Sequence, residues 1–161
     1  MNIVVEIADC HVSDDVGNVL VTYALGSCVG VAIYDPVAKV GGMLHYMLPE
    51  ASPDALSGGK SPYMFADTGI PMLFREAYQK GAHKRRLRVR VAGGAQINDQ
   101  NGVFNIGHRN CLALKKILWK AGVMVHSEET GGKSARTMRL DMSSGRVFLR
   151  SVDCAEEREL K

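Results

Sequence analysis

The chain has 161 residues, of which 46% are hydrophobic and 23% charged, and its formal net charge is +3. These values are typical of a globular domain and predict a single domain over residues 1–161. So small a net charge does not by itself indicate nucleic-acid binding. No signal peptide opens the chain, and no apolar run approaches the ~20 residues that span a bilayer, so we expect a cytoplasmic protein.

Strand-like runs recur along the chain, and two helical segments interrupt them. The predicted strands lie at about residues 2–7, 19–25, 28–34, 40–48, 87–92, 122–127, 136–142 and 146–152. The predicted helices run from about 68 to 80 and from about 108 to 121, each followed by a capping glycine. We expect Asp67 to be the N-cap of the first helix, which leaves Pro71 near its first turn. This order of elements predicts an α+β fold, a layered β-sheet sandwich with flanking helices.

Residues 49–62 form the one long connection between predicted elements. A loop of this length is either mobile or functional, and it leaves directly from the strand that contains His45. We therefore expect it to act as a lid or to contact the substrate.

The four cysteines do not form a disulfide or metal framework. Cys10, Cys28, Cys111 and Cys154 show no Cys-x-x-Cys spacing, and a chain without a secretion signal is not expected to depend on disulfides. A zinc site built on Cys10 and His11 is the alternative, but adjacent Cys-His is not a usual ligand spacing. We expect no metal and no cofactor.

Cys28 differs from the other cysteines because of the residues before it. Gly26 and Ser27 break the chain at the start of an apolar strand, and such a corner frees backbone N–H groups and exposes the side chain. A free cysteine is more often a small buried hydrophobe, as we expect of Cys111 on the apolar face of the second helix. For Cys28 the residues alone support a nucleophile and a core thiol about equally.

A hairpin brings Cys28 close to a histidine. An Asp35-Pro36 turn separates the Cys28 strand from the run that contains His45. If Asp35 pairs with Ala38, then Cys28 faces His45 directly, with Cβ atoms ~4.5–5.5 Å apart. A thiol beside an imidazole becomes nucleophilic. A slip of one residue would separate the two side chains, and since Pro36 excludes a type I′ turn, a longer loop with a bulge is the alternative.

The string Leu25-Gly26-Ser27-Cys28-Val29, with Thr22 before it and His45 after it, resembles the bacterial chemoreceptor glutamine deamidase family, CheD. The resemblance covers nearly the whole chain, although Glu129 stands where the family more often has Asp. The further matching blocks are Asp35-Pro36-Val37-Ala38-Lys39, His45-Tyr46-Met47-Leu48-Pro49, Tyr63 with Ala66-Asp67-Thr68, Ala92-Gly93-Gly94-Ala95, Asn105-Ile106-Gly107 with Arg109-Asn110, and Thr130-Gly131-Gly132 with Arg136.

The resemblance implies a protein-glutamine deamidase (glutaminase) that acts in chemotaxis adaptation. Its substrates would be glutamines on the cytoplasmic helices of methyl-accepting chemotaxis receptors, which it converts to glutamate through a Cys-His thioester mechanism. The implied partner is a CheC-type phosphatase of the chemotaxis response regulator. The alternative is a non-catalytic module that docks and regulates that phosphatase. The same acyl chemistry would also cleave a glutamyl methyl ester.

The resemblance assigns Cys28 as the nucleophile, His45 as its base and Thr22 as the third member of the site. A Thr22 hydroxyl or carbonyl that accepts from the second ring nitrogen of His45 would fix the tautomer of the ring. We expect His45 to hold Cys28 as a thiolate, with a pKa below the free value of ~8.5. Backbone N–H groups at the Gly26–Cys28 corner, among them those of Gly26 and Ser27, are the candidate oxyanion donors.

Two further segments are candidates for binding. Gly93 and Gly94 end a predicted strand, where a tight turn and a close contact with substrate are equally well supported. Arg86, Arg88 and Arg90 alternate with apolar residues, and this alternation predicts that the arginines face outward. A solvated strand face is the default, steering toward an acidic protein partner is the second alternative, and RNA binding is the third because no aromatic residues interleave.

Overall fold

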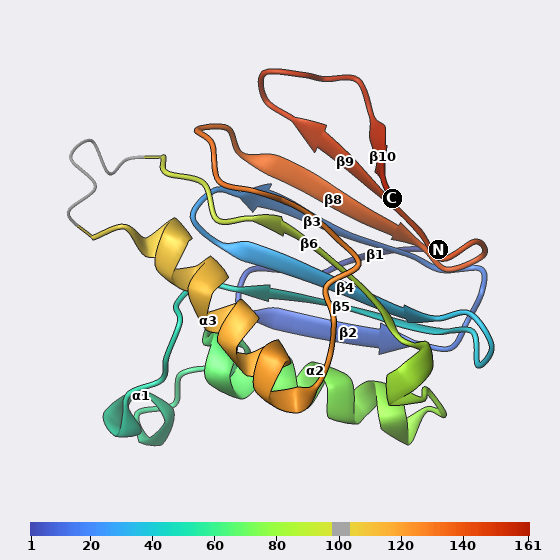
Figure 1. Cartoon of the computed structure of the whole chain (residues 1–161), viewed down its shortest axis with the longest axis horizontal. Coiled ribbons are helices and arrows are strands. Elements are labelled where there is room, and N and C mark those ends of the chain that lie inside the picture. Colours follow the sequence, from blue (N-terminus) through green and yellow to red (C-terminus); the bar gives the residue numbers. More distant parts are fainter. Residues whose placement is uncertain (98–103) are drawn as a thin grey trace.

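The computed structural model of the chain describes residues 1–97 and 104–161. Two five-stranded sheets pack face to face, and the helices cover the outer face of one of them (Figure 1). The first sheet contains, in spatial order, β1 (Asn2–Val4), β3 (Val19–Leu25), β8 (Arg136–Asp141), β9 (Arg146–Ser151) and β10 (Arg158–Leu160). The second contains β2 (Asp9–Ser13), β5 (Val40–Tyr46), β4 (Val29–Asp35), β6 (Arg88–Gly93) and β7 (Ser127–Thr130).

The helices are α1 (Pro53–Ser57), α2 (Ala66–Gln79) and α3 (Ile106–Ala121), with short 3-10 turns η1 (Pro62–Met64) and η2 (Lys84–Arg86). The predicted layered sandwich with flanking helices is confirmed. None of the described helices is long and apolar enough to cross a bilayer.

Strands β4 and β5 lie between two hydrophobic cores, which explains why both read as unbroken apolar runs. Alternate residues point to opposite faces of a strand. On β4, Val29, Val31 and Ile33 pack toward the helices, whereas Ala32 and Tyr34 pack between the two sheets. The inter-sheet core is the layer that holds the candidate site.

The hairpin register differs from the predicted one by two residues. Asp35 pairs with Val40 rather than with Ala38, so a four-residue loop joins β4 to β5 and Gly30, not Cys28, stands opposite His45. The Asp35 carboxylate accepts from the backbone N–H groups of the next residues in the loop, which accounts for its extra length. Because the shift is even, Cys28 and His45 still share a face.

Helix α2 begins two residues earlier than predicted, at Ala66, and Asp67 is not its N-cap. The N-cap is Phe65, which makes no side-chain capping bond. Asp67 lies in the first turn, where its carboxylate accepts from the N–H of Ala51. Pro71 consequently lies inside the helix rather than in its first turn. Tertiary contacts to the preceding loop replace the local cap.

Several short elements were not predicted, and one predicted strand is misplaced. β2, β10 and α1 have three to five residues each, too few for a period to emerge. The predicted strand at 122–127 is wrong: β7 starts at Ser127. Its apolar residues Val123 and Val125 pack against the helix-side core instead of joining a ladder.

Candidate active site

Cys28 lies where the chain crosses from one sheet to the other. Residues 26–28 connect β3 of the first sheet to β4 of the second. The pairing of β3 with β8 is interrupted by a bulge between Thr22 and Leu25, and Ala24 within it has a left-handed φ of 59°. Bulges turn strands out of their ladder, and they are frequent beside active sites. Here the bulge bends β3 into the crossing that presents Cys28.

Three consecutive carbonyl groups of this turn are each held by a donor. The carbonyl of Gly26 accepts from the N–H of Ala95 at 2.7 Å, and that of Cys28 accepts from the N–H of Gly94 at 2.8 Å. Between them, the carbonyl of Ser27 accepts from the side-chain amide of Asn110 at 2.9 Å. The turn is therefore fixed on its carbonyl side.

The N–H groups of the same turn differ in their hydrogen-bond partners. The N–H of Gly26 donates to the carbonyl of Ala24 at 2.9 Å, which removes it from the predicted set of oxyanion donors. Within residues 1–97 and 104–161, the N–H groups of Ser27 and Cys28 donate to no backbone carbonyl. Ser27 and Cys28 thus stay candidate donors.

Gly93 and Gly94 are buried and lie directly against the Cys28 backbone. Gly93 has a φ of 112°, and a Cβ at this position would overlap the carbonyl oxygen of Cys28. Gly94 has a φ of 62°, and a Cβ there would overlap the sulfur of Cys111. Only glycine fits both positions. Neither residue lines the pocket at Cys28, so these contacts make them supports of the turn.

A hydrogen bond joins Thr22 to His45 across the two sheets. Thr22 Oγ1 lies 2.7 Å from His45 Nδ1 and 2.7 Å from the carbonyl oxygen of Val5, and both side chains are fully buried. A hydroxyl has one proton. Since the Val5 carbonyl can only accept, the Thr22 proton goes there, and Thr22 Oγ1 accepts from His45 Nδ1–H. The lone pair of His45 is then on Nε2.

The predicted contact of Thr22 with His45 is therefore present. His45 Nε2 is buried and has no hydrogen-bond partner in the described part of the chain. Cys28 lies two residues along β4 from the position opposite His45. Cys28 itself precedes the first residue of β4, just beyond the end of the β4–β5 ladder.

Burial sets the protonation of both groups. It lowers the pKa of His45 to about 4. Burial also raises the pKa of Cys28, which the hydrogen bond from its own backbone N–H only partly offsets. The expectation of a lowered thiol pKa is wrong: at neutral pH the site holds a neutral thiol and a neutral imidazole whose free nitrogen is a base.

A pocket of about 450 Å³ opens beside Cys28. It lies between the crossing turn, the segment after β6 and the start of α3. No residue of the 49–62 connection lines it, so the expected lid does not contact the pocket. The described residues that line it are Ala24, Gly26, Ser27, Cys28, Ala95, Gln96, Ile97, Phe104, Ile106 and Gly107.

The predicted arginine stripe is not a uniform outer face. Arg86 lies in η2, not in β6, and its guanidinium holds the buried carboxylate of Asp35 at 3.0 Å. Arg90 is half-buried, and its Nη1 reaches the carbonyl of Gly145 at 3.5 Å. Arg88 alone is exposed. Period two predicted the side of the strand correctly, but on β6 that side partly faces the other sheet.

Similarity to known proteins extends over most of the chain. The family described as CheD chemotactic sensory transduction matches residues 47–151. A Solibacter usitatus protein named "Probable chemoreceptor glutamine deamidase CheD" is 54% identical, over 91% of this chain and 87% of its own length. The Syntrophus aciditrophicus protein named "Probable chemoreceptor glutamine deamidase CheD 1" is 51% identical, over 93% and 94%. This chain belongs to the CheD family.

Among solved structures, a Neisseria meningitidis protein of the DUF152 family aligns with this CheD member at 10% identity and a TM-score of 0.44. The alignment covers 80% of this chain and 62% of that one.

Asn110 is the residue of this CheD site whose contacts the sequence did not predict. It lies on α3, is fully buried, and bonds to the turn that carries Cys28. A signal for it was present: Asn110 falls on the buried face of α3 with Gly107, Leu114 and Leu118. A buried amide must find hydrogen-bond partners, so an Asn in an apolar helical stripe indicates a specific contact.

Proposed function

We propose that this protein is a chemoreceptor glutamine deamidase in which Cys28 is the nucleophile, His45 the base and Thr22 the residue that fixes the histidine tautomer. The observation that carries the proposal is the buried Thr22–His45 hydrogen bond, which leaves Nε2 of His45 as a lone-pair base on the face it shares with Cys28. The names of the 54% and 51% identical relatives support the substrate class.

The first half of the reaction forms a thioester. His45 Nε2 takes the thiol proton as the Cys28 sulfur attacks the carboxamide carbon, and the carbonyl electron pair moves onto the oxygen. The N–H groups of Ser27 and Cys28, which donate to no backbone carbonyl of the described residues, are the candidate donors to that oxyanion, where one lost donor costs ~10²–10³-fold in rate. His45 then returns the proton to the leaving nitrogen, so ammonia departs.

The second half restores the enzyme. His45 Nε2 takes a proton from water, the hydroxide attacks the thioester carbon, and the sulfur leaves and is reprotonated. The sum is glutamine plus water to glutamate plus ammonia. A glutamyl methyl ester would follow the same steps with methanol as the leaving group.

The test is deamidation of a chemoreceptor cytoplasmic fragment, followed by peptide mapping of amide-to-acid conversion and by ammonia release. Wild type and Cys154→Ala, a variant of an exposed cysteine away from the site, are expected to react equally. Cys28→Ala should retain its circular dichroism spectrum and lose the reaction. Conversion by folded Cys28→Ala at the wild-type rate would refute the mechanism.

The finer partner assignment follows from the resemblance to the family. The receptor helices lie in the cytoplasm, where we place the enzyme. A CheC-type phosphatase is the second partner, and it competes with the receptor for the surface that binds the receptor. Co-elution of Cys28→Ala with such a phosphatase, displaced by receptor fragment, tests this. If Cys28→Ala co-elutes while wild type shows no deamidation, the protein is the docking module of the alternative.

A further inference from the structure

We propose that Asn110 is a positioning residue of the reaction: its side-chain amide ties the turn that carries Cys28 to the strand that carries His45. The inference rests on the proposed function for its consequence in turnover, and on hydrogen bonds of the structure for its geometry. Asn110 does not line the pocket, so it acts through the two residues that it aligns.

One amide nitrogen makes both connections. Asn110 Nδ2 donates to the carbonyl of Ser27 at 2.9 Å and to the carbonyl of Met47 at 2.8 Å. Both partners are acceptors, so the orientation of the amide is fixed: the nitrogen must face them. Ser27 directly precedes Cys28, and Met47 follows His45 by two residues.

The two bonds that Asn110 donates, to Ser27 and to Met47, form a clamp just beyond the end of a β-ladder. The last pair of the β4–β5 ladder is Val29 with Tyr46. The same register would place Cys28 opposite Met47, but the ladder does not continue to this pair. Asn110 bridges this gap as a substitute for the next rung. Removing the Asn110 side chain would therefore remove both hydrogen bonds of this bridge.

The amide is retained at a cost. Asn110 is fully buried, and its Oδ1 has no hydrogen-bond partner among the described residues. A leucine in this apolar stripe of α3 would be buried without an unpaired oxygen. What the amide supplies is therefore its pair of donated bonds. The other carbonyls of the turn are held by backbone N–H groups of Gly94 and Ala95, so Asn110 is the side-chain anchor among these three.

The experiment compares Asn110→Ala with a matched control, Tyr46→Phe. Tyr46 is also buried and donates to the backbone carbonyl of Asn110 at 2.7 Å, so its substitution removes one buried bond of the same helix and leaves the clamp in place. Deamidation kcat and KM, the melting temperature, and the rate of Cys28 alkylation by iodoacetamide are measured for both variants and for wild type.

In Asn110→Ala, kcat should fall about 10²-fold with KM unchanged, the size of effect that ~1 Å of misplacement produces. Alkylation of Cys28 should become faster, because the released turn exposes a half-buried thiol. Tyr46→Phe should lower the melting temperature and leave both rates as in wild type. A merely structural Asn110 would lower the melting temperature alone.

The inference is overturned if folded Asn110→Ala keeps wild-type kcat and wild-type Cys28 alkylation, or if Tyr46→Phe loses as much kcat. If Asn110→Ala does not fold, Asn110→Asp decides. Its carboxyl keeps the shape but donates only when protonated, and then only one of the two bonds, so kcat relative to wild type should recover in part as pH falls; a pH-independent ratio contradicts the clamp. Turnover surviving in Cys28→Ala would refute the proposed function only, since the alkylation rates still decide the role of Asn110.

Discussion

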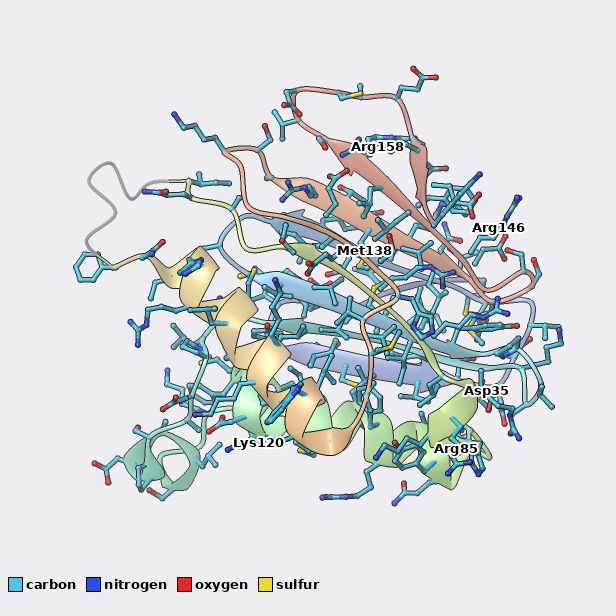
Figure 2. The ribbon with its side chains drawn as sticks, viewed as in Figure 1. Asp35, Arg85, Lys120, Met138, Arg146 and Arg158 are labelled. Carbon is cyan, nitrogen blue, oxygen red and sulfur yellow. The ribbon has the colours of Figure 1, made fainter. Side chains whose placement is uncertain are left out.

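The two ends of strand β4 carry opposite kinds of polar group. At the hairpin end, which the label Asp35 marks in Figure 2, the carboxylate is fully buried. It accepts from the backbone N–H groups of Val37, Ala38 and His83 and from the guanidinium of Arg86. At the other end, Cys28 is half-buried, and beside it two buried polar atoms, one on His45 and one on Asn110, have no partner among the described residues.

The contrast indicates that the Asp35 end of the strand stabilises the fold, whereas the Cys28 end lies at the candidate site. Every bond to Asp35 favours its charged form, and the group has no remaining capacity for another molecule. At the Cys28 end, the two buried polar atoms have no partner within residues 1–97 and 104–161, and an unpaired buried polar atom costs folding free energy. A free nitrogen on His45 is what a proton transfer needs. The same strand therefore ends in an anchor of the fold on one side and adjoins the proposed reactive groups on the other.

The largest expected effect is at the satisfied end. Asp35→Ala leaves the Arg86 guanidinium and three N–H groups without their acceptor, and we expect a loss of about 3–5 kcal/mol in the free energy of unfolding. Asp14→Ala, at an exposed carboxylate, should change it by less than ~0.5 kcal/mol. Urea titration measures both. Equal stabilities would show that Asp35 is not an anchor of the hairpin.

The next effect is at the reactive end. Thr22→Val removes the acceptor for His45 Nδ1–H, and we expect kcat to fall about 10²-fold, the lower end of what a positioned base contributes. Thr22→Ser keeps the hydroxyl and should retain most of the turnover. Steady-state deamidation kinetics of the two variants provide the measurement. A valine variant as active as the serine variant would mean that the tautomer is fixed by something else.

The acid stability of the protein should reflect Asp35. Burial alone would raise the pKa of Asp35, but the hydrogen bonds from Arg86, Ala38, His83 and Val37 together lower it from 3.8 to about 2. A lowered folded-state pKa contributes stability that is present above pH ~4 and lost as pH falls through ~2, here about 2 kcal/mol. Asp35→Asn should lack this part of the decline. Unfolding free energies at several pH values between 5 and 2 would reveal a parallel decline in both proteins if the assignment were wrong.

The smallest effect concerns the resting state of Cys28. Because burial raises the pKa of the thiol and lowers that of His45 to about 4, no ion pair forms at neutral pH. Alkylation of Cys28 should therefore increase with pH through the alkaline range and remain slower at pH 7 than that of exposed Cys154. Peptide-resolved mass spectrometry after brief iodoacetamide treatment measures both rates. A Cys28 rate that stays constant from pH 5 to 8 would instead indicate a thiolate–imidazolium pair.

Local patterns in the sequence predicted the side of each strand better than the pairing. Alternation placed Cys28 and His45 on one face, and this held because an even shift of register conserves the face. The pairing partner was wrong because the Asp35 side chain organises a longer loop through its own hydrogen bonds. The alternation of apolar and polar residues carries no trace of such a side-chain turn.

Contacts between distant segments were beyond the reach of the sequence. Thr22 was assigned through the resemblance to CheD, but that its hydroxyl crosses between sheets depends on the packing of β3 against β5. Arg86 was placed in an outward stripe because period two continued through it, whereas the chain turns at η2 and directs it to Asp35. Asn110 carried a readable signal, a buried amide, yet its partners lie 83 and 63 residues away.

The hydrogen bond between Thr22 and His45 crosses from one sheet to the other, so its length depends on the distance between the two sheets. Met138, labelled in Figure 2, helps to set this distance. It lies on β8, where it pairs with Thr22 of β3. Its sulfur would lie 3.0 Å from a Cβ at Gly30, the residue opposite His45. Any change that thickens this layer, such as a side chain at Gly30 or an oxidised sulfur at Met138, lengthens the reach from hydroxyl to imidazole. The packing of this layer is thereby coupled to the proposed turnover, because the thickness of the core sets the distance between hydroxyl and imidazole.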